Sequence, residues 1–134
     1  MLLAFQDPGW VDAYLRSVPL EPLTPRTITD VTELRHRLEM IRREGFAVSI
    51  GEAVPGAAGV AAPIFNPDGS VTAGLLIAAP VERFEGELPE LKRLLREAAT
   101  RVAGITQELT KEKVEVPGQR DLPRRRPRGR NRAA

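Results

Sequence analysis

Few residues in this 134-residue sequence have side chains that could perform chemistry. The single histidine, His36, lies among arginines, with no second histidine, no cysteine and no paired acid at metal-ligand spacing. A surface position is therefore favoured over a ligand or a general base. Four glutamates could supply an acid and base pair, namely Glu82, Glu85, Glu87 and Glu90. They cluster where a helix is expected to begin, and the helix dipole favours negative charge there, so a solvated helix entrance explains them better.

The motifs of catalysis and of cofactor binding are missing from the sequence. No nucleophile elbow, Walker loop, dinucleotide fingerprint or zinc signature occurs. With no cysteine, the chain has no thiolate metal site and no thiol nucleophile. We therefore expect no catalytic residue, no metal and no cofactor, and a protein that is not an enzyme.

A glycine-containing segment, Gly56-Ala57-Ala58-Gly59, looks like the GxxG loop with which KH domains clamp a nucleic-acid backbone. The match is weak, because the KH loop joins two helices and carries basic residues, whereas this segment follows Pro55 and leads into a strand. Small residues also let a backbone approach a ligand or a neighbouring strand closely. Pocket lining and plain packing are both open interpretations of this segment.

Charge is distributed unevenly along the chain. Residues 1–110 carry 11 Lys and Arg against 15 Asp and Glu, whereas residues 111–134 carry 9 against 3. The Arg-rich end could bind phosphates through counterion release, or it could be a solubilising appendage, which we favour. Because it contains almost nothing to bury, we expect residues 111–134 to be a disordered tail.

Composition is that of an ordinary folded chain, with 42% apolar and 28% charged residues. The length allows one domain, which we place at residues 1–110. The absence of cysteine fits a reducing cytoplasm, and the N-terminal residues resemble neither a signal peptide nor a membrane anchor. We therefore expect a cytoplasmic protein without membrane association.

Helical spacing and capping residues predict the first two helices. Asp7 and Pro8 open a helix over 8–18, and three prolines then predict an extended connection up to residue 29. A second helix over 31–44 begins with a capping box formed by Asp30 and Glu33, and Gly45 provides a left-handed end.

The second half of the chain predicts strands followed by a helix. A short strand over 46–50 is followed by a loop or irregular strand at 51–59 and a strand at 60–65. The turn Asn66-Pro67-Asp68-Gly69 joins the last of these to a strand over 71–79, which makes a β-hairpin, and apolar spacing predicts a helix over 88–109. The predicted fold class is α+β, with helices packed on an antiparallel sheet.

Four segments, in this order, resemble the effector domain of IclR-type bacterial transcription regulators. They are T-I-T-D-x-x-x-L at 27–34, R-R-E-G-F-A-V at 42–48, G-x-x-G-V-A-A-P-I-F-N-P-D-G at 56–69, and a strand ending in A-P at 79–80. The similarity runs from about Leu2 to Ile105. It implies a GAF-like domain in which a small metabolite binds in a cavity beside a curved antiparallel sheet.

The resemblance implies an effector site at Ser49, Ala57, Gly59, Leu76 and Ala78. Relatives that bind small oxoacids look as though they carry Asp, Cys and Ser at several of these positions, and this chain lacks most of those polar groups. A carboxylate buried without donors is disfavoured by several kcal/mol. We therefore expect an effector less polar than a small oxoacid, an aromatic compound for example, or no effector at all.

The chain departs from the family's layout at its beginning. Residues 1–5 resemble the end of the family's G-K-A-L-L-A-F helix, so we expect both the winged helix-turn-helix and the opening strands of the effector domain to be absent. Any DNA binding of the family type would then require a domain outside this chain. The missing strands would expose a sheet edge, and we expect a homo-oligomer, such as a dimer, or poor solubility.

The function that these observations favour is effector sensing within transcription regulation. Two alternatives stay open at this point. One is a stand-alone ligand-binding or dimerisation module that does not bind DNA. The other is a nucleic-acid-associated protein that acts through its Arg-rich tail.

Overall fold

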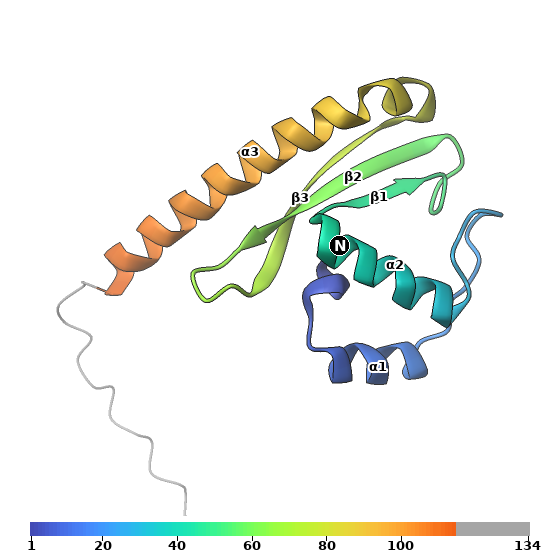
Figure 1. Cartoon of the computed structure of the whole chain (residues 1–134), viewed down its shortest axis with the longest axis horizontal. Coiled ribbons are helices and arrows are strands. Elements are labelled where there is room, and N and C mark those ends of the chain that lie inside the picture. The colour runs from blue at the N-terminus through green and yellow to red at the C-terminus, as the bar shows by residue number, and fades with distance from the viewer. Residues whose placement is uncertain (115–134) are drawn as a thin grey trace, which may run out of the picture.

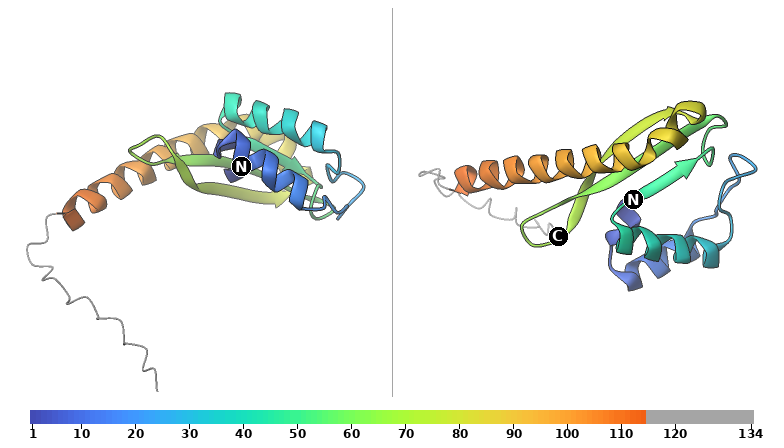
Figure 2. Two further views of the ribbon diagram at one scale, coloured as in Figure 1. Left: turned by 90° about the horizontal axis from the view of Figure 1, so that it is seen from below. Right: turned by 45° about the horizontal axis from the view of Figure 1, so that its top comes forward.

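A computed structural model describes residues 1–114 of the chain (Figure 1). Three antiparallel strands form one sheet in the order β1-β2-β3. The long helix α3 covers one face of this sheet, and a smaller group of helices lies against the other (Figure 2). The elements in chain order are η1 (Leu2–Phe5), α1 (Pro8–Ser17), α2 (Val31–Glu44), β1 (Ala47–Ile50), β2 (Ala57–Phe65), β3 (Val71–Pro80) and α3 (Val81–Val114). The predicted α+β class is confirmed.

Side chains of each strand alternate between the two faces of the sheet. On the face beneath α3, Ala58, Val60 and Ala62 of β2 are buried against Phe84, Leu95 and neighbouring residues. The opposite face carries the other residues of the same strands. One row across it is set by the register, in which Gly59 is paired with Ser49 of β1 and with Ala78 of β3.

The helices α1 and α2 pack mainly on each other and on η1. Their shared cluster contains Ala4, Val11, Leu15, Leu38 and Ile41, and Ala47 is the sheet residue that packs against it. This second cluster is separate from the one beneath α3. It holds α2 beside the sheet. The space between α2 and the sheet face opposite α3 is only partly filled by side chains.

Both predicted helix starts have the expected side-chain caps. Asp7 accepts a hydrogen bond from Trp10 N at 2.9 Å, and Asp30 accepts one from Glu33 N at 2.8 Å. Gly45 ends α2 with φ of +77°, a left-handed conformation that glycine adopts without strain. The boundaries of α1 and α2 therefore follow from local chemistry, as the sequence predicts.

Several boundaries differ from the sequence prediction, most clearly at β2 and α3. β2 begins at Ala57 and not at residue 60, because the short segment before Val60 is already paired with both neighbouring strands, through Ile50 and Pro80. α3 begins at Val81 and not at residue 88, because Phe84 is fully buried beneath the sheet and fixes the first turns. This helix even contains Pro89, a residue that normally disfavours a helix interior.

α3 also extends to Val114, beyond the predicted end at residue 109. Apart from residues 111–114, the predicted disordered tail lies outside the described residues. The same is true of the Arg-rich stretch that could contact phosphates. Both remain predictions.

Candidate functional site

A hollow of about 370 Å³ lies between the sheet and the helices α2 and η1. We call it the α2 pocket. Its wall is mostly apolar, with aliphatic side chains from α2 and η1 on one side and small residues of β1 and β2 on the other. The lining residues are Met1, Leu3, Thr27, Ile28, Leu34, Arg37, Leu38, Ile41, Ala47, Val48, Ser49, Glu52, Gly59, Ala61 and Leu76.

The structure brings three of the five predicted effector residues together at this pocket. Ser49, Gly59 and Leu76 line it, one from each strand. Ala57 and Ala78 are exposed and do not belong to the lining. Ala78 is nevertheless paired with Gly59 in the sheet, whereas Ala57 lies at the start of β2 opposite Pro80.

Gly59 sits close to β3 as well as facing the pocket. A Cβ atom at this position would lie 3.2 Å from Leu76 Cδ1 and 3.4 Å from the Ile77 carbonyl oxygen. The small residue therefore gives room to the Leu76 side chain and leaves the pocket open. Both interpretations of the Gly-Ala-Ala-Gly segment, packing and pocket lining, apply at Gly59.

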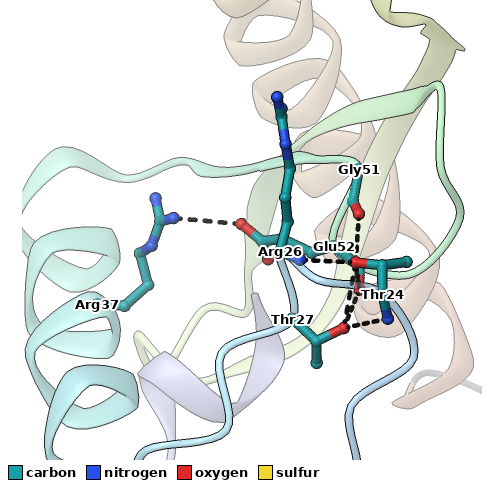
Figure 3. Close-up of polar contacts among 6 residues, drawn as sticks. All are labelled: Thr24, Arg26, Thr27, Arg37, Gly51 and Glu52. Atoms are coloured by element: carbon teal, nitrogen blue, oxygen red, sulfur yellow. Dashed lines mark hydrogen bonds and ion pairs between the residues drawn. The ribbon is translucent and has the colours of Figure 1, made fainter.

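The charged side chains of the lining are Arg37 and Glu52, and they pair with each other. Arg37 Nη2 lies 3.2 Å from Glu52 Oε1 (Figure 3). Both side chains are partly exposed, so the pair lies toward the outside of the pocket. Within the described lining, Arg37 therefore already has an anionic partner.

Two threonines of the connection between α1 and α2 hold the backbone that carries Glu52 (Figure 3). The buried Thr24 Oγ1 donates a hydrogen bond to the Gly51 carbonyl at 2.7 Å. Thr27 Oγ1 donates one to the Glu52 carbonyl at 2.6 Å and accepts one from Thr24 N at 2.9 Å. These bonds fasten the connection to the loop after β1 and fix one wall of the pocket.

The N-terminal residues are held over the pocket by the last turn of α2. Arg42 Nε donates to the Ala4 carbonyl at 2.7 Å, and its Nη2 donates to the Gln6 carbonyl at 2.8 Å. Met1 thereby lies in the lining, where burial lowers the pKa of its amino group. An arginine far away in the sequence thus helps to hold the wall formed by η1, together with the packing of Ala4 in the α1–α2 cluster.

A second hollow, of about 400 Å³, lies on the α3 side of the sheet near the β2–β3 turn. It is lined by Phe46, Pro63, Arg96 and Ala99, among other residues, and the Arg96 guanidinium lies 4.9 Å from the centre of the Phe46 ring. None of the five predicted effector residues lines it. We call it the α3 groove.

Residues 1–114 show no group of three or more His, Cys, Asp or Glu side chains that could hold a metal ion. Within the same residues, no helix is both long and apolar enough to span a bilayer.

Comparison with known proteins identifies the domain. Residues 1–104 match the family described as bacterial transcriptional regulator IclR, C-terminal. The chain belongs to this family. The resemblance inferred from the sequence motifs is thereby confirmed, and the family consists of transcriptional regulators and not of enzymes.

Individual IclR-family relatives agree in sequence and in fold. The HTH-type transcriptional regulator KdgR of Escherichia coli (strain K12) is 35% identical over 104 residues, which cover 77% of this chain and 40% of KdgR. The crystal structure of the KdgR C-terminal domain superimposes with a TM-score of 0.73 at 34% identity, covering 79% of this chain and 65% of that one.

A third relative is a double mutant of the inducer-binding domain of PobR from Acinetobacter, solved as a complex with 3-hydroxybenzoic acid. It has a TM-score of 0.72 at 26% identity and covers 76% of this chain and 59% of that one. The chain spans about two fifths of the length of the curated relatives it matches. The matched part lies within the C-terminal domain of these regulators and covers about two thirds of the solved KdgR domain.

Sequence reasoning missed Arg37 and Glu52 as pocket residues. A signal for Arg37 exists, because it follows Leu34 by three residues and precedes Ile41 by four, which places all three on one face of α2. Glu52 has no comparable signal, since its position depends on the fold of the loop after β1.

Proposed function

We propose that this chain is the effector-sensing part of an IclR-type transcription regulator and that the α2 pocket binds its effector. The observation that carries the proposal is a hollow of about 370 Å³ lined by Ser49, Gly59 and Leu76 from three strands. This volume lies within the range of small-molecule sites, roughly 300–1,000 Å³. The structure of the PobR domain with 3-hydroxybenzoic acid supports a sensing role for the equivalent domain here.

We further propose that the effector is a small molecule less polar than a small oxoacid. The wall of the α2 pocket is mostly apolar, and its charged side chains, Arg37 and Glu52, are already paired. A carboxylate entering it would have to compete with Glu52 for Arg37 or lose its hydration without compensation. An aromatic compound of moderate polarity would instead gain from contact with Leu34, Leu38 and Ala61.

The remaining parts of the proposal concern the whole regulator. It acts in the cytoplasm as a homo-oligomer. DNA binding belongs to a winged helix-turn-helix, which is not among the described elements.

Isothermal titration calorimetry with four probes tests the sensing role and the polarity together. Phenol and benzyl alcohol, which are aromatic and uncharged, should bind more tightly than pyruvate and glyoxylate. The variant Ala61→Leu, which adds three carbons to the pocket wall, should weaken the aromatic probes at least about tenfold, since overlap with a close-packed site is strongly unfavourable. Ala13→Leu adds the same atoms at an exposed position of α1 and serves as the matched control.

Tight binding of pyruvate or glyoxylate would overturn the proposed polarity. Binding of the aromatic probes that Ala61→Leu and Ala13→Leu leave equally unchanged would overturn the assignment to the α2 pocket.

A further inference from the structure

The α3 groove, the hollow of about 400 Å³ on the α3 side of the sheet, has the size of a small-molecule site. It lies where the second half of α3 runs past the β2–β3 turn (Figure 1). Much of its wall is apolar and consists of rings and methyl groups, namely those of Phe46, Pro63, Phe65, Ala99 and Ala103. Such a wall suits a ligand with a flat, apolar body.

One cation stands beside this apolar wall. Among the described residues that line the groove, Arg96 is the only charged one, and none is acidic. Its guanidinium lies 4.9 Å from the centre of the Phe46 ring, and Lys92 Nζ lies 5.4 Å from the same centre. Contact with a ring orients a guanidinium and leaves the N–H donors at its edge able to bind a carboxylate. The groove therefore combines an apolar wall with an oriented, positively charged donor group.

Arg96 has no carboxylate partner among residues 1–114. The spacing along α3 explains this, because the positions three and four residues away on either side hold basic, alanine or threonine residues. Arg93, one turn earlier, binds both nearby glutamates, with 2.6 Å to Glu90 Oε1 and 2.6 Å to Glu97 Oε1. The guanidinium at the groove is thus available to an anion from outside.

The groove also lies on a side of α3 that a further element of the domain would not be expected to cover. The chain covers about two thirds of the solved KdgR domain, which therefore has additional elements. The exposed apolar residues of α3, Leu94 and Ile105, lie on the side of the helix opposite Arg96, because an α-helix has about 3.6 residues per turn. An element that buries apolar surface of α3 would pack on that side and leave the groove accessible.

We propose that the α3 groove is a second small-molecule site and that it binds a small aromatic carboxylate. The ring of this ligand would contact Phe46 and Phe65, and its carboxylate would accept hydrogen bonds from the Arg96 guanidinium. The α2 pocket differs, because its cation, Arg37, is paired with Glu52. The two sites therefore suit different ligands, an uncharged one in the α2 pocket and an anionic one in the α3 groove.

Methyl NMR of the full 134-residue chain titrated with benzoate tests the proposal. The methyl signals of Ala99 and Ala103 should shift together and saturate, while those of Leu34 and Ile41 in the α2 pocket stay in place. Benzyl alcohol has the ring without the charge, and acetate has the charge without the ring. Each should bind the groove at least about tenfold more weakly than benzoate, because each makes only part of the contacts.

Two arginine variants separate recognition by Arg96 from a general effect of charge. Arg96→Gln should weaken benzoate binding at least about tenfold, because it removes the charged donors and keeps part of the stem. Arg101→Gln makes the same change at an exposed position on another side of α3 and is the matched control. Because Arg96 is exposed, both variants should fold, which far-ultraviolet circular dichroism checks.

The α2 pocket is tested separately, since Ala61→Leu should leave benzoate binding to the α3 groove unchanged. The absence of a saturable shift at Ala99 and Ala103 would overturn the proposal, as would equal benzoate affinities of Arg96→Gln and Arg101→Gln. Benzyl alcohol that binds the groove as tightly as benzoate would overturn the proposed ligand class. Benzoate shifts confined to the α2 pocket would overturn the assignment to the groove.

Discussion

The two faces of the sheet use alternate residues of the same strands and are covered in different ways. Beneath α3, Ala58, Val60 and Ala62 are exposed to only 4%, 0% and 2%. The neighbouring residues Gly59 and Ala61 point to the other face, where α2 and η1 leave a hollow. One face is closed by packing, and the other is held open.

This difference follows from which helix fills the space. α3 inserts the large side chains of Phe84 and Leu95 against small alanines, so the α3 face is dense. α2 instead directs Leu38 and Ile41 into a separate cluster with α1 and η1, and only part of its apolar stripe reaches the sheet. The stability of the domain should therefore reside mainly on the α3 face, and its binding capacity mainly on the α2 face.

The largest expected effect comes from removing a large buried side chain from the α3 face of the sheet. Phe84→Ala should lower the free energy of unfolding by about 3–5 kcal/mol, because it removes a fully buried ring and leaves a cavity. Leu76→Ala, on the open face, removes a mostly exposed side chain and should change the same quantity by less than about 1 kcal/mol. Urea denaturation followed by circular dichroism measures both. Similar losses in the two variants would contradict the division of roles between the faces.

The next effect concerns the connection between α1 and α2, which forms one wall of the α2 pocket. Thr24→Val keeps the shape of a buried side chain but removes the hydroxyl that donates to Gly51, and should reduce stability by about 1–3 kcal/mol. Thr29→Val, at an exposed position of the same connection, is the control. Equal denaturation midpoints for the two variants would mean that the threonine clamp does not hold this wall.

A smaller loss is expected from the start of α2. Asp30→Ala removes the side chain that accepts the hydrogen bond from Glu33 N and should lower stability by about 1 kcal/mol. Glu39→Ala removes the same charge from an exposed position within the helix and should have little effect. Thermal unfolding of the two variants compares them, and a loss as large in Glu39→Ala would point to net charge instead of capping.

The smallest effect is expected for Gly59→Ala, which we compare with Gly74→Ala on the same face of the sheet. A Cβ at Gly59 would meet the end of the exposed Leu76 side chain, which can move, so Gly59→Ala should be close to neutral. A Cβ at Gly74 would lie 3.0 Å from the Ala62 carbonyl oxygen, which is fixed in the sheet. Gly74→Ala should therefore cost about 1–3 kcal/mol, as overpacking does. Equal stabilities of the two variants would show that the backbone at Ala62 can move far enough to make room for a Cβ atom at position 74.

Local signals in the sequence predicted much of this fold. The caps at Asp7 and Asp30, the glycine end at Gly45 and the Asn66–Gly69 turn act within a few residues, and each fixed an element correctly. The start of α3 was wrong, because Gly86 and Pro89 disfavour a helix locally and only the burial of Phe84 against distant strands overrides them.

The candidate site shows the same limit. Spacing placed Ser49 and Leu76 on strands and Gly59 at the end of a loop or irregular strand, and the family resemblance selected all three. Glu52 could not be found in this way, because its place at the pocket depends on contacts with Thr24, Thr27 and Arg37, which are 15 to 28 residues away in the sequence.

Methyl NMR of the isotope-labelled chain titrated with phenol tests most directly whether the open face is the binding face. Our account predicts that the methyl signals of Leu34, Leu38 and Ile41 shift together and saturate, while those of Leu91 and Leu95, which α3 packs on the other face of the sheet, stay in place. Shifts confined to the α3 side, near the α3 groove, or the absence of any saturable shift would contradict it.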